Sequence, residues 1–250
     1  MALRRFVVLA ILFSTHVGAA SENGAHVPFV GCPGDGQLGS VAPPSGKPVP
    51  AAIAPNVAAQ LAFYKGTYSP GVFAPAGWHC REWYGSNGSF VVVTPVAPPD
   101  RLTAQPVPGP GVELVSQNGG TSGRFSVAEI AARFFPDLMR DFIQQVRDEK
   151  LLPESKFSPT PYSKDTAKRI GDRMVEFSTP ARSAGFGTEG LLTQSGLPIR
   201  GIVALNPATE ETGISVLRVR LPPGQETLSA AILGIETRCL QKLHGCDPTR

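Results

Sequence analysis

The first 20 residues constrain this chain most, because they have the pattern of a secretory leader. Arg4 and Arg5 precede an apolar run over residues 6–13, and small residues follow the run as far as Ala20. A leader of this kind is removed on export. Its apolar run is much shorter than the roughly 20 residues that a membrane-spanning helix needs. We therefore predict a signal peptide over residues 1–20 and a mature chain without a transmembrane segment.

The charge of the mature chain is nearly balanced. The full chain has 23 basic and 20 acidic side chains, so the loss of Arg4 and Arg5 leaves a net charge of about +1. Such a balance does not attract nucleic acid. The roughly 230 residues that remain are enough for a sizeable core. We predict a single exported domain over residues 21–250, in which residues 28–95 and 124–250 could form subdomains.

All four cysteines follow the predicted leader. An even number of cysteines in an exported chain favours disulfides over reactive thiols. Three pairings are compatible with four cysteines. Proximity along the chain favours Cys32 with Cys80, and Cys239 with Cys246. The second pair requires a helix to end before Cys246, because residues seven apart on a continuous helix are separated by about 10 Å.

The first half of the mature chain is rich in Pro and Gly, which predicts a loop-rich half held by a disulfide. Helical spacing of apolar residues indicates a short helix over residues 56–65, and residues 73–83 show no regular pattern. A buried strand is predicted over residues 89–94. A second Pro/Gly-rich stretch, residues 95–123, is a candidate linker that contains a short edge strand over residues 112–116.

The second half alternates helices and strands. Ser126 as N-cap with Glu129 three residues later predicts the start of a helix, which Pro136 should kink or split. Three strands and a long closing helix are expected over residues 173–178, 199–205, 214–221 and 226–243. The predicted fold is therefore α+β, an antiparallel sheet with flanking helices that include a long C-terminal helix.

Alternation along the last predicted strand suggests one solvated face. Arg218 and Arg220 alternate with Leu217, Val219 and Leu221. The two arginines could bind an anion together with Arg200 from the neighbouring strand, but a face open to water is the simpler interpretation.

Familiar nucleotide and metal motifs fail on inspection. Residues 185–190 read GFGTEG, which matches GxGxxG, yet the segment that follows contains Gly196 and Pro198 and cannot form the helix that a dinucleotide site requires. We predict a loop or turn there. His26, His79 and His244 show no metal-binding spacing. The sequence therefore predicts no metal and no cofactor.

Residues 63–90 are dense in aromatic side chains and include both tryptophans. Such residues can stack on sugar faces or hold a peptide, or they can pack as a core around the disulfide. The candidate ligand-binding residues are Trp78, Arg81, Trp83, Tyr84 and Asn87. The sequence around Asn87 also favours a tight turn before the strand that begins near Phe90.

Catalysis has one candidate in this segment. His79 could act as a general base with Ser86 as a nucleophile, but Ser86 lies in YGSNG, which lacks the GxSxG elbow of serine hydrolases. The sequence identifies no catalytic residue, and an enzyme is the less favoured interpretation.

Three segments of the chain are similar to segments of other proteins. They are GWHCREWYGSNGS at residues 77–89, GCPGDGQ around Cys32, and STPARSAGFGTEG near the middle of the second half. The chain resembles a group of uncharacterised exported bacterial proteins that share the GWHC and YGSNGS segments. The resemblance implies a bacterial setting and supplies no activity, ligand or catalytic residue.

These observations lead to two functional hypotheses. The first is a periplasmic or secreted, non-enzymatic protein that binds an envelope component or a protein partner through the aromatic segment, or has a structural role there. The alternative is a hydrolase that acts on envelope material with His79 as general base.

Overall fold

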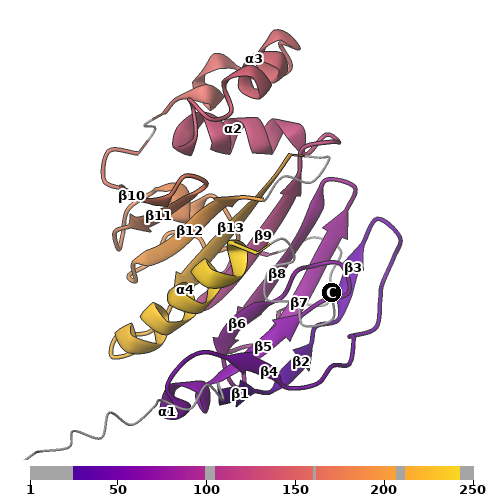
Figure 1. The fold of residues 1–250 in the computed structure, drawn as a ribbon, viewed down its shortest axis with the longest axis vertical. Coiled ribbons are helices and arrows are strands. Elements are labelled where there is room, and N and C mark those ends of the chain that lie inside the picture. The colour runs from indigo at the N-terminus through magenta and orange to yellow at the C-terminus, as the bar shows by residue number, and fades with distance from the viewer. Residues whose placement is uncertain (1–24, 99–104, 160–161, 207–211, 243–250) are drawn as a thin grey trace, which may run out of the picture.

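The computed structural model describes residues 25–98, 105–159, 162–206 and 212–242. The predicted signal peptide and Cys246 lie outside these ranges. Figure 1 shows a large twisted sheet with helix α4 (Glu226–Leu240) across one face, and with helices α2 (Arg124–Phe134) and α3 (Arg140–Asp148) gathered at one end. The α+β class and the C-terminal helix are therefore confirmed.

Eight strands form the large sheet, in the order β10-β11-β12-β13-β9-β8-β7-β3. All neighbours are antiparallel except β3 and β7. Their bounds are β3 Gly34–Gly36, β7 His79–Gly85, β8 Gly88–Thr94, β9 Gly111–Asn118, β10 Thr166–Gly171, β11 Met174–Thr179, β12 Ile199–Leu205 and β13 Gly213–Arg220.

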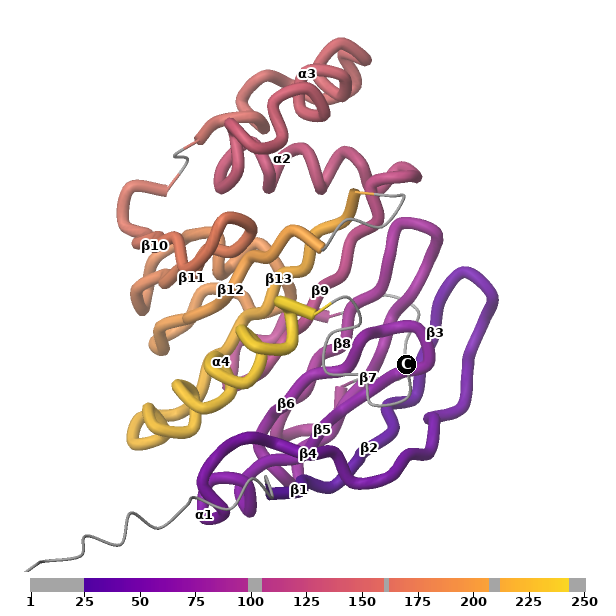
Figure 2. Tube along the Cα trace, in the orientation of Figure 1, coloured from indigo at the N-terminus to yellow at the C-terminus, as the bar shows by residue number. Residues whose placement is uncertain are grey.

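Smaller elements complete the N-terminal part. A three-stranded sheet joins β2 (Phe29–Gly31), β5 (Leu61–Lys65) and β6 (Val72–Pro75), and β1 (Ala25–Val27) pairs with β4 (Val49–Ala51). Helix α1 is one turn, Pro55–Ala58, and the 3-10 turns η1 and η2 span Glu154–Phe157 and Phe186–Thr188. Figure 2 shows residues 25–98 towards one end of the molecule and residues 124–159 and 162–205 towards the other.

The two faces of the large sheet bury different clusters. One face packs against α4 and the three-stranded sheet, and α4 contributes Leu228, Ile232 and Ile235 to this cluster. Each such side chain stabilises the fold by about 1.5–3 kcal/mol when it is fully buried. The opposite face packs against α2 and η2 through residues such as Phe177, Phe186 and Val216. The sheet contains strands from both predicted subdomains, and the subdomain division itself stays a prediction.

Tertiary pairing overrides several local predictions. The helix expected over residues 56–65 is only the turn α1, because residues 61–65 are buried as β5 between β2 and β6. Residues 73–83, whose sequence shows no regular pattern, include most of the two strands β6 and β7. Strand β9 is not an edge strand but pairs with β8 on one side and β13 on the other.

The second half follows the sequence pattern more closely. Strands β11, β12 and β13 and helix α4 lie within a few residues of their predicted bounds, and Pro136 separates α2 from α3 as expected. The predicted N-cap is wrong: Gly123 caps α2, and Ser126 lies inside the helix. Strand β10 was not predicted, because its mostly exposed side chains have no apolar alternation.

The predicted Cys32–Cys80 disulfide is present and links residues 48 apart in the sequence. Cys239 is also disulfide-bonded, and its predicted partner Cys246 lies outside the described residues. Within the described ranges, no helix has the length and apolar composition that crossing a membrane requires.

Candidate functional site

A shallow groove lies on the face of the sheet opposite α4. The antiparallel register places Trp83, Phe90, Val115 and Val216 side by side across β7, β8, β9 and β13. Trp83 and Phe90 stack with their ring centroids 5.1 Å apart. Trp83 is 5% exposed and Phe90 is half-buried. The tryptophan therefore supports the phenylalanine ring from the side, and the phenylalanine faces the groove.

The groove has two adjoining sections that share Phe90, Gln117 and Ser126. One section, about 710 Å³, runs along β3 and the β7–β8 turn. The other, about 570 Å³, runs between α2 and residues 186–191. Its apolar floor includes Val115 and Ile130, which are half-buried. Together the two sections form one open surface with a mixed polar and apolar lining.

An ion pair lies in the sheet beneath the second section. Glu113 and Arg218 occupy opposite positions on β9 and β13, 3.6 Å apart, and they are 2% and 4% exposed. The Glu113 carboxylate also accepts the backbone N–H of Leu191, at 3.1 and 3.2 Å. A buried carboxylate is tolerated only with such compensation. The pair therefore fastens the loop of residues 186–191 to the sheet.

We expect Gly190→Ala to lower the free energy of unfolding by about 1–3 kcal/mol, because the site is already filled. A Cβ at Gly190 would overlap the Glu113 carboxylate and lie 2.8 Å from a guanidinium nitrogen of Arg218. Gly196→Ala is the matched control, since a Cβ there meets nothing within 4 Å. Urea denaturation of the two variants tests this, and equal stabilities would contradict the packing argument.

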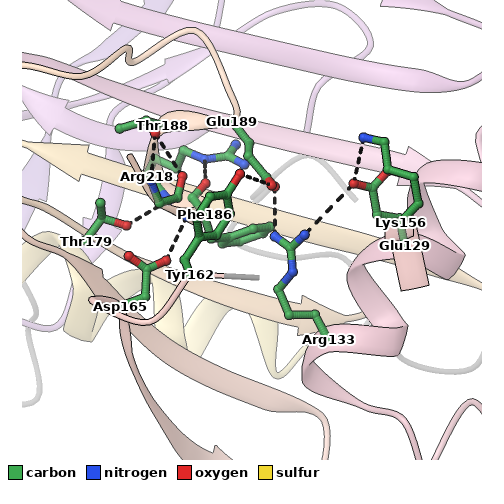
Figure 3. A network of polar contacts seen from close by, with 12 residues as sticks. Glu129, Arg133, Lys156, Tyr162, Asp165, Thr179, Phe186, Thr188, Glu189 and Arg218 are labelled. Atoms are coloured by element: carbon green, nitrogen blue, oxygen red, sulfur yellow. Dashed lines mark hydrogen bonds and ion pairs between the residues drawn. The ribbon is translucent and has the colours of Figure 1, made fainter. Parts of the chain in front are cut away.

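A network of polar side chains on α2, η1 and the 186–191 loop lies along the second section (Figure 3). Arg133 bonds to Glu189 at 2.9 Å and lies 3.9 Å from Glu129, which also pairs with Lys156 at 3.1 Å. Tyr162 donates its hydroxyl hydrogen to Glu189 at 2.8 Å. Burial first, and then the bond to Glu189, raises the pKa of Tyr162 to about 12. Tyr162 therefore stays protonated and acts as a donor.

Residues 185–190 form a loop, as predicted; it contains the 3-10 turn η2 and does not open an α-helix. The Asp165 carboxylate accepts the N–H of Phe186 at 2.7 Å, and Thr179 Oγ1 accepts the N–H of Gly187 at 2.9 Å (Figure 3). These backbone donors are therefore already used within the fold and do not face a phosphate.

The predicted solvated face of the last strand is wrong. All eight residues of β13 are buried, including Arg218 and Arg220. Arg200 is exposed, pairs with Glu176 at 2.7 Å and lies on the other face of the sheet, next to the α4 groove lined by Val219. The three arginines therefore do not form one anion site.

Arg220 instead joins two loops. Its guanidinium donates to the backbone carbonyls of Gly109, Val107 and Thr193, with the Gly109 bond at 2.7 Å. The loops also bond to each other through Val107 and residues 191–193. Burial lowers the pKa of Arg220 to about 10, and the Glu113 charge opposes this shift. The side chain therefore remains charged at neutral pH.

The predicted ligand-binding residues divide between locations. Trp83, Tyr84 and Asn87 line the first section of the groove. Trp78 lies in the turn before β7 and packs against the α4-side core. Arg81 is buried and pairs with Asp35 at 3.8 Å. The predicted aromatic loop is in fact a β-hairpin, whose alternation sends neighbouring side chains to opposite faces.

The hairpin turn around Asn87 is confirmed. Gly85 pairs with Gly88, so Ser86 and Asn87 form a two-residue turn, and Gly88 has φ of +132°. An ordinary side chain rarely adopts this conformation. The Asn87 carbonyl accepts the backbone N–H of Asn118 at 2.8 Å, and its side chain accepts the hydroxyl hydrogen of Ser122. The turn is thereby joined to the start of α2.

His79 is exposed at the beginning of β7, opposite Thr94. In the described part of the chain its imidazole forms no hydrogen bond or ion pair. The Thr94 hydroxyl donates to the Val96 carbonyl at 2.7 Å. The geometry therefore supplies neither an orienting carboxylate nor an activated nucleophile beside His79.

Sequence reasoning missed the groove residues that lie outside the aromatic segment, above all Gln117, Ser126 and Glu113. No hydrogen bond engages the side chain of Gln117 or Ser126 among the residues that the structure describes. A signal was present, because Glu113, Val115 and Gln117 alternate along one strand and so share a face. Only the pairing of β9 with β8 and β13 places that face beside Phe90 and α2.

The described residues contain no group of three or more His, Cys, Asp or Glu side chains arranged to hold a metal ion. In comparisons with known proteins, no protein-family model, no curated protein and no solved structure matches this chain.

Proposed function

We propose that this chain is an exported bacterial protein, periplasmic or secreted, that binds a component of the cell envelope without chemical conversion. The observation that carries the proposal is the open groove whose lining combines Phe90 with the side chains of Gln117 and Ser126, which form no hydrogen bond with any residue that the structure describes. A concave surface with an apolar floor and a few polar groups is typical of ligand sites.

The proposed location is supported by the leader pattern of residues 1–20 and by the Cys32–Cys80 disulfide. Disulfides persist mainly in oxidising compartments. A protein partner in the envelope would be the alternative occupant of the same groove.

The hydrolase alternative requires His79 to act as a general base. Its imidazole is accessible, but the contacts described above give it no partner, so no geometric feature favours this function over binding. We retain it only as an outcome of the experiment below.

We expect the mature protein to sediment with isolated cell-wall sacculi or membrane vesicles of its own bacterium. Ser126→Trp should weaken this association at least tenfold, because Ser126 is exposed where the two groove sections meet and an indole there fills the groove. The matched control is Gln145→Trp, on the exposed side of α3, which should bind like the wild type.

Equal binding by the wild type and Ser126→Trp would refute the groove as the binding site, and absence of binding to every fraction would refute the function. Release of soluble fragments by the wild type, abolished in His79→Ala, would establish the hydrolase instead. Mass spectrometry of the protein from its own bacterium would test export, which predicts a chain lacking residues 1–20 with paired cysteines.

A further inference from the structure

We propose that the groove takes an uncharged sugar chain, with one pyranose ring on the Phe90 side chain. This inference rests on the proposed function and deepens it by naming the ligand class.

The first argument concerns charge. Every ionised side chain that lines the two groove sections has a counter-ion within the fold. The pairs and distances are Glu113–Arg218 at 3.6 Å, Glu129–Lys156 at 3.1 Å, Glu189–Arg133 at 2.9 Å and Asp35–Arg81 at 3.8 Å. An anionic or cationic ligand would have to compete with these pairs for its partner. The lining therefore favours a ligand without net charge.

The second argument concerns the polar groups that remain. Gln117 on β9 lies opposite Gly88 on β8, and Phe90 is two residues after Gly88 on the same strand. Ser126, on α2, also lines both groove sections. An amide and a hydroxyl both donate and accept hydrogen bonds. They match the hydroxyl groups of a sugar, while the aromatic ring matches its apolar C–H face.

The third argument concerns the backbone of the floor. An extended peptide gains most of its affinity by adding to an unpaired strand edge. Strands β8, β9 and β13 are each paired on both sides. Strand β3, which lines the first section, is at the edge of the sheet, but the backbone N–H and C=O of Gly34 bond to Val41, and those of Gly36 bond to the Asp35 side chain and to Gly39. The groove therefore offers no such edge. A peptide in this position would have to bind through side chains alone, and we therefore favour the sugar chain.

Tryptophan fluorescence provides a direct test. Trp83 stacks on Phe90, and Trp78 is the other tryptophan of the chain. Trp78→Phe isolates the signal of Trp83. We expect its emission to change saturably on titration with at least one of four uncharged tetrasaccharides, built from glucose, N-acetylglucosamine, galactose or mannose. A galacturonic acid tetramer and a capped tetra-alanine peptide should produce no saturable change.

Variants connect the signal to the groove. In the Trp78→Phe background, the double variant Gln117→Ala/Ser126→Ala should raise the dissociation constant about tenfold or more, since two hydrogen bonds are lost. Gln145→Ala, an exposed glutamine on α3, should leave it unchanged. An equal effect of the control variant would overturn the assignment, and so would tighter binding of the acidic tetramer or the peptide.

Failure of this inference can be separated from failure of the proposed function. Suppose that envelope fractions bind the wild type but bind Ser126→Trp much more weakly, while none of the four uncharged tetrasaccharides binds. The groove is then supported as the binding site, and the proposed ligand class is wrong. If neither the envelope fractions nor the tetrasaccharides bind, both proposals fail.

Discussion

Arg220→Met should lower the free energy of unfolding by about 3–5 kcal/mol, because it leaves three partly buried backbone carbonyls without their donor. The Arg220 side chain is 0% exposed and bonds to Gly109, Val107 and Thr193. Methionine replaces most of its volume, so the loss is mainly of hydrogen bonds. Urea denaturation measures the effect, and amide hydrogen exchange should become faster over residues 105–110 and 191–193.

Arg200→Met is the matched control, because Arg200 lies on the neighbouring strand β12, is exposed and, among the described residues, forms only the surface pair with Glu176. Surface pairs of this kind contribute about 0–1 kcal/mol. A loss of stability in Arg220→Met no larger than that in Arg200→Met would contradict the role of Arg220 as the link between the two loops.

Glu236→Gln should remove a pronounced dependence of stability on pH. Glu236 lies on α4, is 1% exposed, and accepts the backbone N–H of Phe73 at 2.7 Å. Burial, only partly opposed by this bond, raises the pKa of Glu236 to about 8. The folded protein therefore prefers the neutral acid, whereas the unfolded chain ionises near its ordinary value of about 4.5.

The direction of the effect follows from the raised pKa. The contribution of Glu236 to stability is fully present below about pH 4.5 and is lost as pH rises towards 8, by about 5 kcal/mol in total. Glutamine resembles the neutral acid in shape and keeps the acceptor for Phe73. We therefore expect Glu236→Gln to match the wild type near pH 4.5 and to be clearly more stable at pH 8.

Thermal unfolding from pH 4.5 to 9 tests this prediction, with Glu226→Gln as the control on the same helix. Glu226 is exposed, and hydrogen bonds from backbone N–H groups, including that of Gly224, lower its pKa. Its stabilisation is therefore present above its unfolded pKa and lost in acid, the opposite direction. Parallel pH profiles for the wild type and Glu236→Gln would show that the Glu236 carboxyl is not held neutral in the fold.

The candidate site was only partly accessible from the sequence. Aromatic density pointed to the segment that supplies Trp83, Tyr84 and Asn87 to the groove. Trp78 and Arg81 are neighbours of these residues in the chain, but Trp78 packs against the α4-side core from the turn before β7. Arg81 shares the face of β7 that carries Trp83, yet it is buried in its pair with Asp35. Gln117 and Ser126 reach the groove through strand pairing and helix packing, which have no local signature.

Buried charge was the least predictable feature. Arg218 and Arg220 alternate with apolar residues, a pattern that ordinarily means a face in water. Here the 105–110 and 186–193 loops fold over that face and supply three carbonyls to Arg220, while strand β9 supplies the Glu113 carboxylate to Arg218. The sequence pattern shows that Arg218 and Arg220 are polar. It does not show the groups that compensate their buried charges, because these groups lie 27 or more residues away in the chain.

By itself the sequence determined the α+β class, the closing helix, the strands β11 to β13, the division of the helix at Pro136 and the Cys32–Cys80 pair. These features follow from local periodicity, from the missing N–H of proline and from a small number of cysteines. Only the tertiary structure decided that residues 61–65 form a strand, that β9 is central, and which side chains share the groove. Each depends on hydrogen bonds and burial between distant segments, which no local pattern encodes.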